Sequence, residues 1–453
     1  MSRSYDVLVL GAGNAGMGAA GVTRAAGKSV AVVESWDVGG TCPLRGCVPK
    51  KVLVAAAQVL HQIDLAPQHH ISVGKPALDW AALIARERTF VEGVPEAFTK
   101  SLEDRGIDLV RGRARFAAHD RVAVENGGDT IELEAETIVI ATGSKPRPLP
   151  IPGAEHLITS DDILEMATLP DSLIFIGGGV IALEFSHVYA RAGTKVTILE
   201  ALPRLLPRND ADAVAQLHKE AERIGIDVLT GVEIERIEQA GNELRVVFAH
   251  DGQEKSLSAA RVANGTGRVA DLDGLDLAAG GVAHDGLRIE VEPWLRSASN
   301  PKVHVAGDAL WSSAQLSPIA TYEGRLVGQN IVDGGARVPE YLHIPANVYT
   351  VPALASVGLT EDEARDRDLA FTVKSNDMTG FRSSKTHAET VAFSKVLVED
   401  GAGRILGAHM VGHGAEEVIH LFAFAMKHGI TAGELADTVY AYPTFASDMK
   451  FMV

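Results

Sequence analysis

The sequence predicts an α/β protein with two Rossmann-like dinucleotide-binding domains and a C-terminal α+β domain. Three observations predict this fold class. A short apolar run near the N-terminus leads into a glycine turn, the same unit returns 166 residues later with Gly177 in the place of Gly11, and a mixed pattern of strands and helices follows from about residue 338. A strand, a glycine turn, a helix and a second strand, in that order, are typical of a nucleotide-binding βαβ unit.

The first unit begins with the apolar run at residues 6–10 and turns at residues 11–16. A helix of small residues is expected from Met17 to about Ala26, and a strand at residues 30–33 ends at an acid. Glycines let the backbone approach a pyrophosphate at the helix N-terminus, and the acid can bond a ribose. The candidate nucleotide-binding residues of this unit are Gly11, Gly13, Ala15, Gly16 and Glu34.

The second unit has the same layout. A strand at residues 173–176 ends in three glycines, a helix is expected from Leu183 to about Arg191, and a strand at residues 195–199 ends at Glu200. The corresponding candidates are Gly177, Gly179, Ile181 and Glu200. Two dinucleotide units in one chain indicate two nucleotide cofactors, a combination that suits FAD and a nicotinamide.

The remaining segments supply shorter elements. Helices are expected within residues 58–100, and strands at residues 108–110, 122–124, 131–133, 137–142, 227–230, 232–238, 244–248 and 303–305. A proline cluster at residues 146–152 is typical of a linker between domains. Polar or small residues at strand ends and at one helix start are candidate ligand contacts, namely Gly143, Gly267, Asp308 and Ser317.

The C-terminal region alternates strands and helices, which predicts an antiparallel α+β domain. Strands are expected at residues 346–350, 371–374, 391–398 and 405–411, and helices at 361–367, 415–428 and 432–436. Its histidines, including His409, His413 and His420, are expected in the core or an interface, and no metal site is predicted. The predicted domain segments are residues 1–148, 149–269, 270–337 and 338–453.

The only two cysteines, Cys42 and Cys47, stand four residues apart before an apolar run that predicts a helix. Pro49 suits a first helical turn, which places Cys47 at or just before the helix N-terminus, where a thiol loses its proton more readily. Lys50 and Lys51 break the usual preference for acids in a first turn and indicate an anion nearby. The alternative is a pair of buried cysteines followed by solvated lysines. Without partner histidines a zinc site is disfavoured, so redox chemistry is the better interpretation.

Composition narrows the function further. The chain has 453 residues and a net charge of −17, which argues against nucleic acids and anionic membranes as partners. Residues 1–6 do not resemble a signal peptide, and no apolar stretch is long enough for a membrane span. A cytoplasmic location is therefore expected.

These features together resemble the FAD-dependent pyridine nucleotide–disulfide oxidoreductases, which include glutathione reductase, dihydrolipoamide dehydrogenase and mercuric reductase. The resemblance covers essentially the whole chain. Residues 5–16 resemble the FAD motif, residues 40–51 the redox-active disulfide, residues 141–143 and 306–308 two further flavin contacts, and residues 177–184 the nicotinamide motif. Residues 356–360 and 403–409 resemble the dimerisation domain, so the resemblance implies a homodimer.

The resemblance also implies roles for single residues. Electrons would pass from a nicotinamide through FAD to a Cys42–Cys47 disulfide and on to an acceptor. Cys47 matches the thiol that contacts the flavin, and Cys42 matches the interchange thiol that attacks the substrate. Glu184 and one of Lys50 or Lys51 match the ion pair beside the flavin. Thr41, which precedes Cys42, is also a candidate cofactor-binding residue.

The nicotinamide preference is mixed in sequence. Glu200 would bond a ribose 2′-hydroxyl and repel a 2′-phosphate, which favours NAD(H). Ala182 at the third glycine position resembles NADP-using relatives, and Arg204 and Arg208 are near enough in sequence to reach a phosphate. The charge of Glu200 is weighted most, and NAD(H) is favoured over NADP(H).

The C-terminal segment departs from the disulfide reductases. Their His and Glu acid–base dyad is matched here by Tyr442 and Ser447, and a phenol with a pKa of about 10 is a poor proton shuttle at neutral pH. Mercuric reductases carry a tyrosine there, but their additional C-terminal cysteines are missing. Gly21 and Val22 stand where glutathione reductases carry paired arginines, which argues against glutathione.

Three functional hypotheses follow. The first is a disulfide reductase or dihydrolipoamide dehydrogenase-like enzyme in which Tyr442 or another group replaces the base. The second is a reductase of a non-disulfide acceptor, such as a metal ion like Hg²⁺, a quinone or another electrophile. The third is a redox sensor, which two intact nucleotide units disfavour. The sequence does not identify the acceptor or the direction of the reaction.

Overall fold

A computed structural model describes residues 3–311 and 314–453. Residues 1–2, part of the segment considered above as a possible leader, lie outside the described residues. The chain forms two compact units. The first comprises the chain up to Lys50, Arg86–Arg147 and Arg268–Pro339, and the second comprises Lys51–Ala85, Pro148–Gly267 and Glu340–Val453.

A seven-stranded sheet is the centre of the first unit. Its order is β3-β2-β1-β6-β5-β4, with β16 paired to β6. The strands are β1 (Arg3–Leu10), β2 (Val30–Glu34), β3 (Asp108–Arg111), β4 (Arg113–Ala118), β5 (Arg121–Asn126), β6 (Asp129–Ile140) and β16 (Val303–Val305). The apolar runs of β1, β2 and β6 pair in parallel and are buried, as expected for strands covered on both faces.

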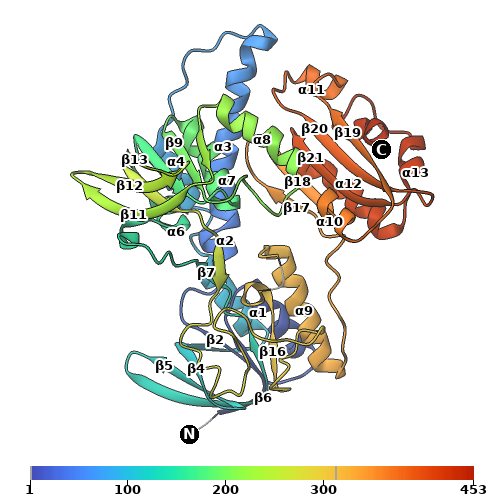
Figure 1. The fold of residues 1–453 in the computed structure, drawn as a ribbon. Coiled ribbons are helices and arrows are strands. Elements are labelled where there is room, and N and C mark those ends of the chain that lie inside the picture. Colours follow the sequence, from blue (N-terminus) through green and yellow to red (C-terminus); the bar gives the residue numbers. More distant parts are fainter. Residues whose placement is uncertain (1–2, 312–313) are drawn as a thin grey trace. The chain divides into compact units, whose positions relative to one another are not determined.

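The helices of the first unit bring two glycine-rich segments together. They are α1 (Asn14–Ala25), α2 (Thr41–Arg45), α5 (Val94–Asp104), the 3₁₀ helix η3 (Gly307–Ala309) and α9 (Ser317–Asp333). Figure 1 shows α1 and α9 side by side, and they contact each other along their length. A small antiparallel sheet joins β7 (Ser144–Pro146) to β15 (Arg268–Ala270).

Strand β6 corrects one expectation. Residues 131–133 and 137–142 were predicted as two strands, but residues 129–140 form a single one. The first part of β6 pairs antiparallel with β5, while the later part lies between β1 and β16 in parallel. Polar residues such as Glu134 and Glu136 interrupt the apolar pattern without interrupting the ladder, because backbone pairing does not require apolar side chains.

The second unit contains the repeated nucleotide unit. Its four parallel strands have the order β10-β9-β8-β14, and a separate antiparallel sheet has the order β11-β12-β13 (Figure 1). These strands are β8 (Ser172–Ile176), β9 (Lys195–Glu200), β10 (Asp227–Thr230), β11 (Glu233–Ala240), β12 (Glu243–His250), β13 (Gln253–Ala259) and β14 (Arg261–Asn264). The accompanying helices are η2 (Ala154–His156), α6 (Ser160–Glu165), α7 (Val180–Ala192) and α8 (Ala211–Arg223).

The C-terminal part of this unit is the predicted antiparallel α+β fold. Its five-stranded sheet has the order β17-β18-β21-β20-β19. The strands are β17 (Ala346–Val348), β18 (Ala353–Gly358), β19 (Phe371–Asp377), β20 (Phe393–Glu399) and β21 (Ile405–Gly412). The helices are α10 (Glu361–Asp366), α11 (Arg382–Thr386), α12 (Ala415–His428), α13 (Ala432–Asp437), η4 (Phe445–Asp448) and α14 (Met449–Met452).

Six strands and five helices were not anticipated from the sequence. They are β4, β7, β13, β14, β15, β18, α2, α6, α8, α11 and α14. Most of these segments are short or polar, and their backbones are ordered by pairing with neighbours more than by an apolar pattern of their own.

The helices between the cysteines and residue 90 pack differently from the predicted division. They are α3 (Cys47–Leu65), η1 (Ala66–His69) and α4 (Trp80–Arg88). Leu53, Val54 and Ile84 join the buried core around Leu173 and Phe175. Residues 51–85 therefore belong to the second compact unit, although we assigned them to the first domain segment.

The length and hydropathy of the helices bear on whether they could cross a membrane. Among the helices of residues 3–311 and 314–453, none combines the length and hydropathy needed to span a bilayer.

Candidate active site

The first glycine turn is so tight that only glycine fits it. Gly11 has a φ of +108°, and a Cβ atom there would lie 2.3 Å from the carbonyl oxygen of Ala141. A Cβ atom on Gly16 would lie 1.9 Å from the carbonyl oxygen of Gly11. A turn of bare backbone before α1 leaves its amides accessible to a pyrophosphate, so these residues fit the predicted FAD site.

The loop before the cysteines lies on this turn. Gly40 has a φ of +72°, and a Cβ atom on it would lie 2.6 Å from the Cα atom of Gly13. Thr41, the first residue of α2, follows directly, and Ala15 is buried in the first turn of α1. The fold therefore brings Thr41 to the predicted flavin contacts of the glycine turn.

The acid at the end of β2 already holds backbone amides. The carboxylate of Glu34 accepts hydrogen bonds from the backbone N–H of Ala12 and of Trp36, both at 2.8 Å. These bonds fix the carboxylate beside the glycine turn, where an adenosine ribose is expected.

The second unit repeats this geometry. The carboxylate of Glu200 accepts hydrogen bonds from the backbone N–H of Gly178 and, at 2.7 Å, of Leu202. Each of these residues follows its counterpart in the first unit by 166 positions. Gly177 has a φ of +98°, Gly179 caps α7, and Ile181 is in its first turn. The glycines leave room for a second dinucleotide, so these residues fit a nicotinamide cofactor.

The two arginines that follow Glu200, Arg204 and Arg208, differ in their surroundings. The guanidinium of Arg204 donates hydrogen bonds to the carbonyl oxygens of Leu206, Asn209 and Pro207, at 2.7 to 3.0 Å. Arg208 is exposed. Arg204 therefore shapes its own loop through its donors.

Two predicted flavin contacts, Gly143 and Asp308, lie close to each other after the end of β6. Gly143 follows this strand with a φ of +75°, and Ser144 Oγ donates a 2.9 Å hydrogen bond to Asp308 Oδ2 in η3. Burial raises the pKa of Asp308, while the bonds from Ser144 and the charge of Arg268 oppose that rise. Gly267, with a φ of +97°, stands in the second unit at the boundary before β15.

Glu323 holds the loop of Asp308 and was missed in the sequence. Its buried carboxylate accepts a 2.7 Å hydrogen bond from the backbone N–H of Gly307. A buried acid normally has a specific partner. A glutamate among the small residues of α9 was the sequence signal that could have identified Glu323.

The two cysteines stand at the starts of successive helices. Cys42 is the second residue of α2 and is half-buried, and Cys47 is the first residue of α3 and is exposed. A hydrogen bond with Cys47 is the main influence that lowers the pKa of Cys42, to about 6; burial opposes it, and bonds with Ser317 and Asn14 add to it. The Cys42 thiol is therefore prepared to be a thiolate at neutral pH.

Lys51 and Glu184 meet at Tyr349. The Nζ atom of Lys51 lies 3.9 Å from the centre of the Tyr349 ring, and Glu184 Oε1 accepts a 2.8 Å hydrogen bond from the Tyr349 backbone N–H. Glu184 is buried in α7, whereas Lys50 and Lys51 are half-buried in the first turns of α3. The pairing of Glu184 with Lys50 or Lys51 stays a prediction.

The C-terminal segment does not assemble an acid beside Tyr442. The Tyr442 side chain is 63% exposed. The Ser447 hydroxyl is engaged with the carbonyl oxygen of Thr444 at 2.6 Å, and the carboxylate of Asp448 accepts a hydrogen bond from Ser383. Ser447, at the position of the missing glutamate, and the neighbouring Asp448 therefore bond groups other than the Tyr442 phenol.

The histidines divide into two groups. His409 is buried and bonds the carbonyl oxygen of Leu359 at 3.0 Å, as expected of a core residue, and His420 is exposed. His413 instead makes a 3.1 Å ion pair with the buried Glu389, which lies 3.2 Å from His61 on its other side. Within the described ranges, no group of three or more His, Cys, Asp or Glu side chains is arranged to hold a metal ion.

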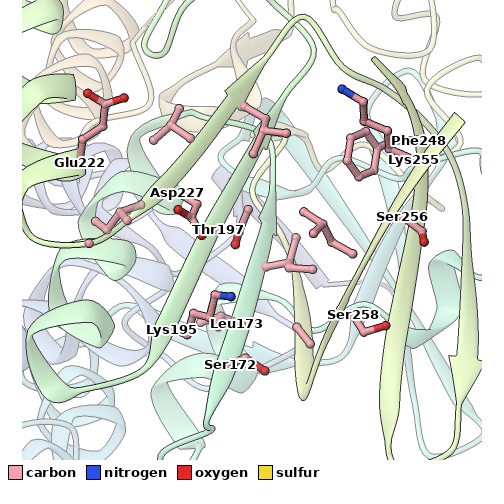
Figure 2. Close-up of a pocket in the computed structure, with 17 residues that line it drawn as sticks. Ser172, Leu173, Lys195, Thr197, Glu222, Asp227, Phe248, Lys255, Ser256 and Ser258 are labelled. Carbon is pink, nitrogen blue, oxygen red and sulfur yellow. The ribbon is translucent and has the colours of Figure 1, made fainter. Parts of the chain in front are cut away.

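The second unit also contains a cleft, which lies away from its glycine turn. Figure 2 shows it between the parallel sheet of β8, β9 and β10 and the strands β12 and β13, with a volume of about 740 Å³. Ser172, Lys195 and Asp227 mark the beginnings of their strands. The cleft is therefore at the amino ends of the parallel strands, whereas Gly177 and Glu200 follow or end them at the opposite edge.

Comparisons with known proteins agree with this geometry. Residues 5–324 match the family model described as pyridine nucleotide-disulphide oxidoreductase, and residues 344–453 match that of its dimerisation domain. A mercuric reductase from Streptomyces lividans is 32% identical over 452 residues, covering 98% of this chain and 95% of the relative. A glutathione reductase from Burkholderia cepacia is 31% identical over 445 residues, covering 98% and 97%.

A dihydrolipoyl dehydrogenase from Chlamydia pneumoniae is also 31% identical, over 98% of this chain and 95% of its own length. Among solved structures, the Cu(II) complex of the HOCl-induced flavoprotein disulfide reductase RclA from Escherichia coli is similar, with a TM-score of 0.89 and 26% identity. That match covers 100% of this chain and 99% of the other.

Proposed function

Because this chain belongs to the FAD-dependent pyridine nucleotide-disulphide oxidoreductases, we propose that it passes electrons from NAD(P)H to a Cys42–Cys47 disulfide and on to an acceptor. The observation that carries this proposal is the cysteine pair at the starts of α2 and α3, on a loop that lies against the first glycine turn. When bound, FAD would link the two-electron chemistry of a nicotinamide to that of the disulfide.

The residues divide this work. Gly11, Gly16 and Glu34 bind the first dinucleotide, and Gly177 and Glu200 bind the second. Two electrons would break the S–S bond and leave two thiolates. By the family resemblance, Cys47 would be the sulfur on the flavin side and Cys42 the sulfur that meets the acceptor. The acceptor would take the two electrons as the S–S bond forms again. Lys50 or Lys51, together with Glu184, would provide charge beside the flavin.

We favour NADH as the electron donor. Glu200 places a negative charge where an NADP 2′-phosphate would have to bind, and such like charges repel. Arg204 spends its donors on three carbonyl oxygens of its own loop, which supports a pocket without a dedicated phosphate clamp.

The first candidate acceptor is a disulfide, as in the lipoamide and glutathione enzymes named among the relatives. Gly21 and Val22 in α1 argue against glutathione itself, as they did in sequence. Proton transfer would then need a group that replaces the missing His–Glu dyad, and Tyr442 is the residue at that position.

The second candidate is a thiophilic metal ion or another non-disulfide electrophile. The engagement of Ser447 and Asp448 with Thr444 and Ser383 favours it, because such an acceptor does not require an imidazole acid. The mercuric reductases and the Cu(II) complex among the related proteins make Hg²⁺ and Cu²⁺ the first ions to try.

The domain boundaries and the oligomeric state are also part of the proposal. We propose FAD-binding segments at residues 1–148 and 270–337, a nicotinamide domain at 149–269 and a dimerisation domain at 338–453. A homodimer is proposed from the matching dimerisation model, and the cytoplasmic location stays a prediction.

Anaerobic titration of the purified protein with NADH and with NADPH tests the electron path. Two-electron reduction should produce a long-wavelength charge-transfer band between thiolate and flavin, and Cys47→Ser should abolish this band. A protein that binds no flavin, or whose flavin neither nicotinamide reduces, would overturn the proposal.

Turnover then identifies the acceptor. NADH oxidation is measured with lipoamide, glutathione disulfide, Hg²⁺, Cu²⁺ and quinones. Tyr442→His combined with Ser447→Glu should raise the rate with disulfides and leave the rate with metal ions unchanged. No gain with any disulfide would show that the missing dyad does not limit disulfide reduction.

A further inference from the structure

We propose that Asn14 and Ser317 hold Cys42 as the attacking thiolate through their side-chain hydrogen bonds, in place of an imidazole base. The inference deepens the proposed function and rests on it, because it takes Cys42 to be the thiol that meets the acceptor. Both residues hydrogen-bond with the sulfur that would react, and they are 303 positions apart in the sequence.

The crossing of α1 and α9 makes this contact possible. A Cβ atom on Gly324 would lie 2.0 Å from the carbonyl oxygen of Ala15, and one on Gly18 would lie 3.1 Å from that of Thr321. Such close backbone approach requires glycine at these positions. The crossing places Asn14 and Ser317, the first residues of their helices, against each other.

The hydrogen-bond directions are consistent with a charged sulfur. The Asn14 amide nitrogen donates to Ser317 Oγ, so the hydroxyl proton of Ser317 is free to point to another acceptor. Both side chains hydrogen-bond with Cys42. A thiolate can only accept, and an amide N–H and a hydroxyl can both donate to it.

The surroundings supply further stabilisation for a negative charge. Both α1 and α9 begin at this point, and neither has an acid in its first turn. The positive ends of two helix dipoles therefore lie near Cys42, and helix N-termini favour a thiolate.

These hydrogen bonds could replace the function of the His–Glu dyad that the C-terminal segment lacks. A base activates a thiol by removing its proton, whereas these donors activate it by stabilising the charge that remains. The hydrogen bonds with Cys47, Ser317 and Asn14 together lower the pKa of Cys42 to about 6 against the effect of burial. Thus Cys42 would be largely ionised at pH 7 although Ser447 and Asp448 offer Tyr442 no acid partner.

The test uses the flavin-loaded protein with Cys47→Ser, which leaves Cys42 as the only thiol of the chain. The rate of alkylation by iodoacetamide is measured from pH 4.5 to 10, and its midpoint reports the pKa of Cys42. Ser317→Val should raise this midpoint by about one pH unit, a tenfold change in the ionisation equilibrium. Asn14→Ala should also raise it.

Two controls separate hydrogen bonding from structure. Ser317→Thr has the shape of the valine variant but keeps the hydroxyl, and it should preserve the midpoint of the Cys47→Ser protein itself, which lacks the bond from the Cys47 thiol. Thr321→Ala removes a hydroxyl one turn further along α9 and should leave the midpoint unchanged. Flavin absorbance confirms that each variant is loaded.

Equal midpoints for Ser317→Val and Ser317→Thr, together with no shift for Asn14→Ala, would overturn the inference. That result is distinguishable from failure of the proposed function. In the latter case NADH would not reduce the unmodified protein, whatever the alkylation midpoints of the variants.

Discussion

At the scale of single residues, Glu200 is the side chain on which the proposed preference for NADH rests. Its carboxylate is held by the backbone N–H groups of Gly178 and Leu202, as Glu34 is held in the first unit. A glutamate at the end of the second strand thus binds backbone amides of the glycine turn in each of the two nucleotide units. A carboxylate in a fixed position discriminates by charge, because it accepts from a ribose hydroxyl but repels a phosphate.

Replacing Glu200 by Gln should weaken this discrimination. The amide oxygen can still accept from Gly178, but the negative charge is lost. We expect kcat/KM for NADPH relative to NADH to rise about tenfold, which corresponds to ~1.4 kcal/mol. Steady-state kinetics with both nicotinamides measures the ratio. Glu222→Gln removes the same charge from helix α8, where it lines the cleft at the amino ends of the strands, and should leave the ratio unchanged; an equal rise there would contradict the role of Glu200.

At the scale of elements, the contact between α1 and α9 supports the flavin and thiol residues together. Gly324→Ala would force a Cβ atom into the backbone of Ala15, and such overpacking costs on the order of 2 kcal/mol. We expect a lower Tm and reduced flavin retention, measured by thermal scanning and by the ratio of flavin to protein absorbance.

The matched control for this variant is Gly335→Ala. A Cβ atom on Gly335 would have its nearest neighbour 3.6 Å away, which is ordinary contact, so its Tm should stay close to that of the unmodified protein. Equal effects of the two substitutions would contradict the importance of the helix crossing.

Glu389 links three further elements within the second unit. Its buried carboxylate lies between His61 of α3 and His413, which follows β21, and the His413 ring stacks on Phe445 with centroids 5.0 Å apart. Burial favours the neutral carboxyl, but the hydrogen bonds from His413 and His61 outweigh it and lower the pKa of Glu389 to about 2. The hydrogen bond with Glu389 raises the pKa of His413.

The stability of this unit should therefore depend on pH in two directions. The contribution of Glu389 is present above its unfolded pKa of about 4.5 and is lost as pH falls through about 2. The contribution of protonated His413 is present below about 6.5 and is lost as pH rises through its raised pKa. Both are present together between about pH 4.5 and 6.5.

Glu389→Gln should remove most of this pH dependence. Because the His413 side chain is partly exposed, its ion pair with Glu389 is worth on the order of 1 kcal/mol, so we expect a lower Tm at pH 6 and a smaller difference between pH 6 and pH 9 than in the unmodified protein. The exposed Glu417→Gln serves as the charge control. An unaltered difference between the two pH values in Glu389→Gln would contradict the ion-pair account.

At the scale of the whole molecule, the C-terminal domain exposes large apolar side chains that a partner would cover. They include Leu421, Phe424, Val439, Tyr442 and Phe451, with exposed fractions from 38% to 97%. This domain matches the dimerisation model of the family, so we propose that the partner subunit covers these side chains.

Phe424→Glu should therefore dissociate the proposed homodimer, because it puts a charge at the outer face of α12. Sedimentation analysis should show a shift from dimer to monomer. Ile131→Glu makes the same change at an exposed apolar position of β6 in the first unit and should leave the dimer intact. A Phe424→Glu protein that remains dimeric would place the interface elsewhere.

The sequence by itself determined the two nucleotide units, the position of the cysteine pair that we propose as the redox group, and the change to an antiparallel C-terminal domain. These features are local: the glycines at residues 11–16 and 177–179 serve turns of their own segment, and Glu34 and Glu200 bond amides close to their own strand ends. Short-range order of this kind is visible in a single stretch of residues.

Only the tertiary structure decided how distant groups meet. Asn14 reaches Ser317 because α1 and α9 cross, and Glu323 holds Gly307 by the same packing. Glu389 lies between two histidines that no sequence spacing relates, and β6 is one strand because both of its neighbours pair with it. Such contacts depend on the packing of whole elements, whose close approach is not encoded in any local pattern.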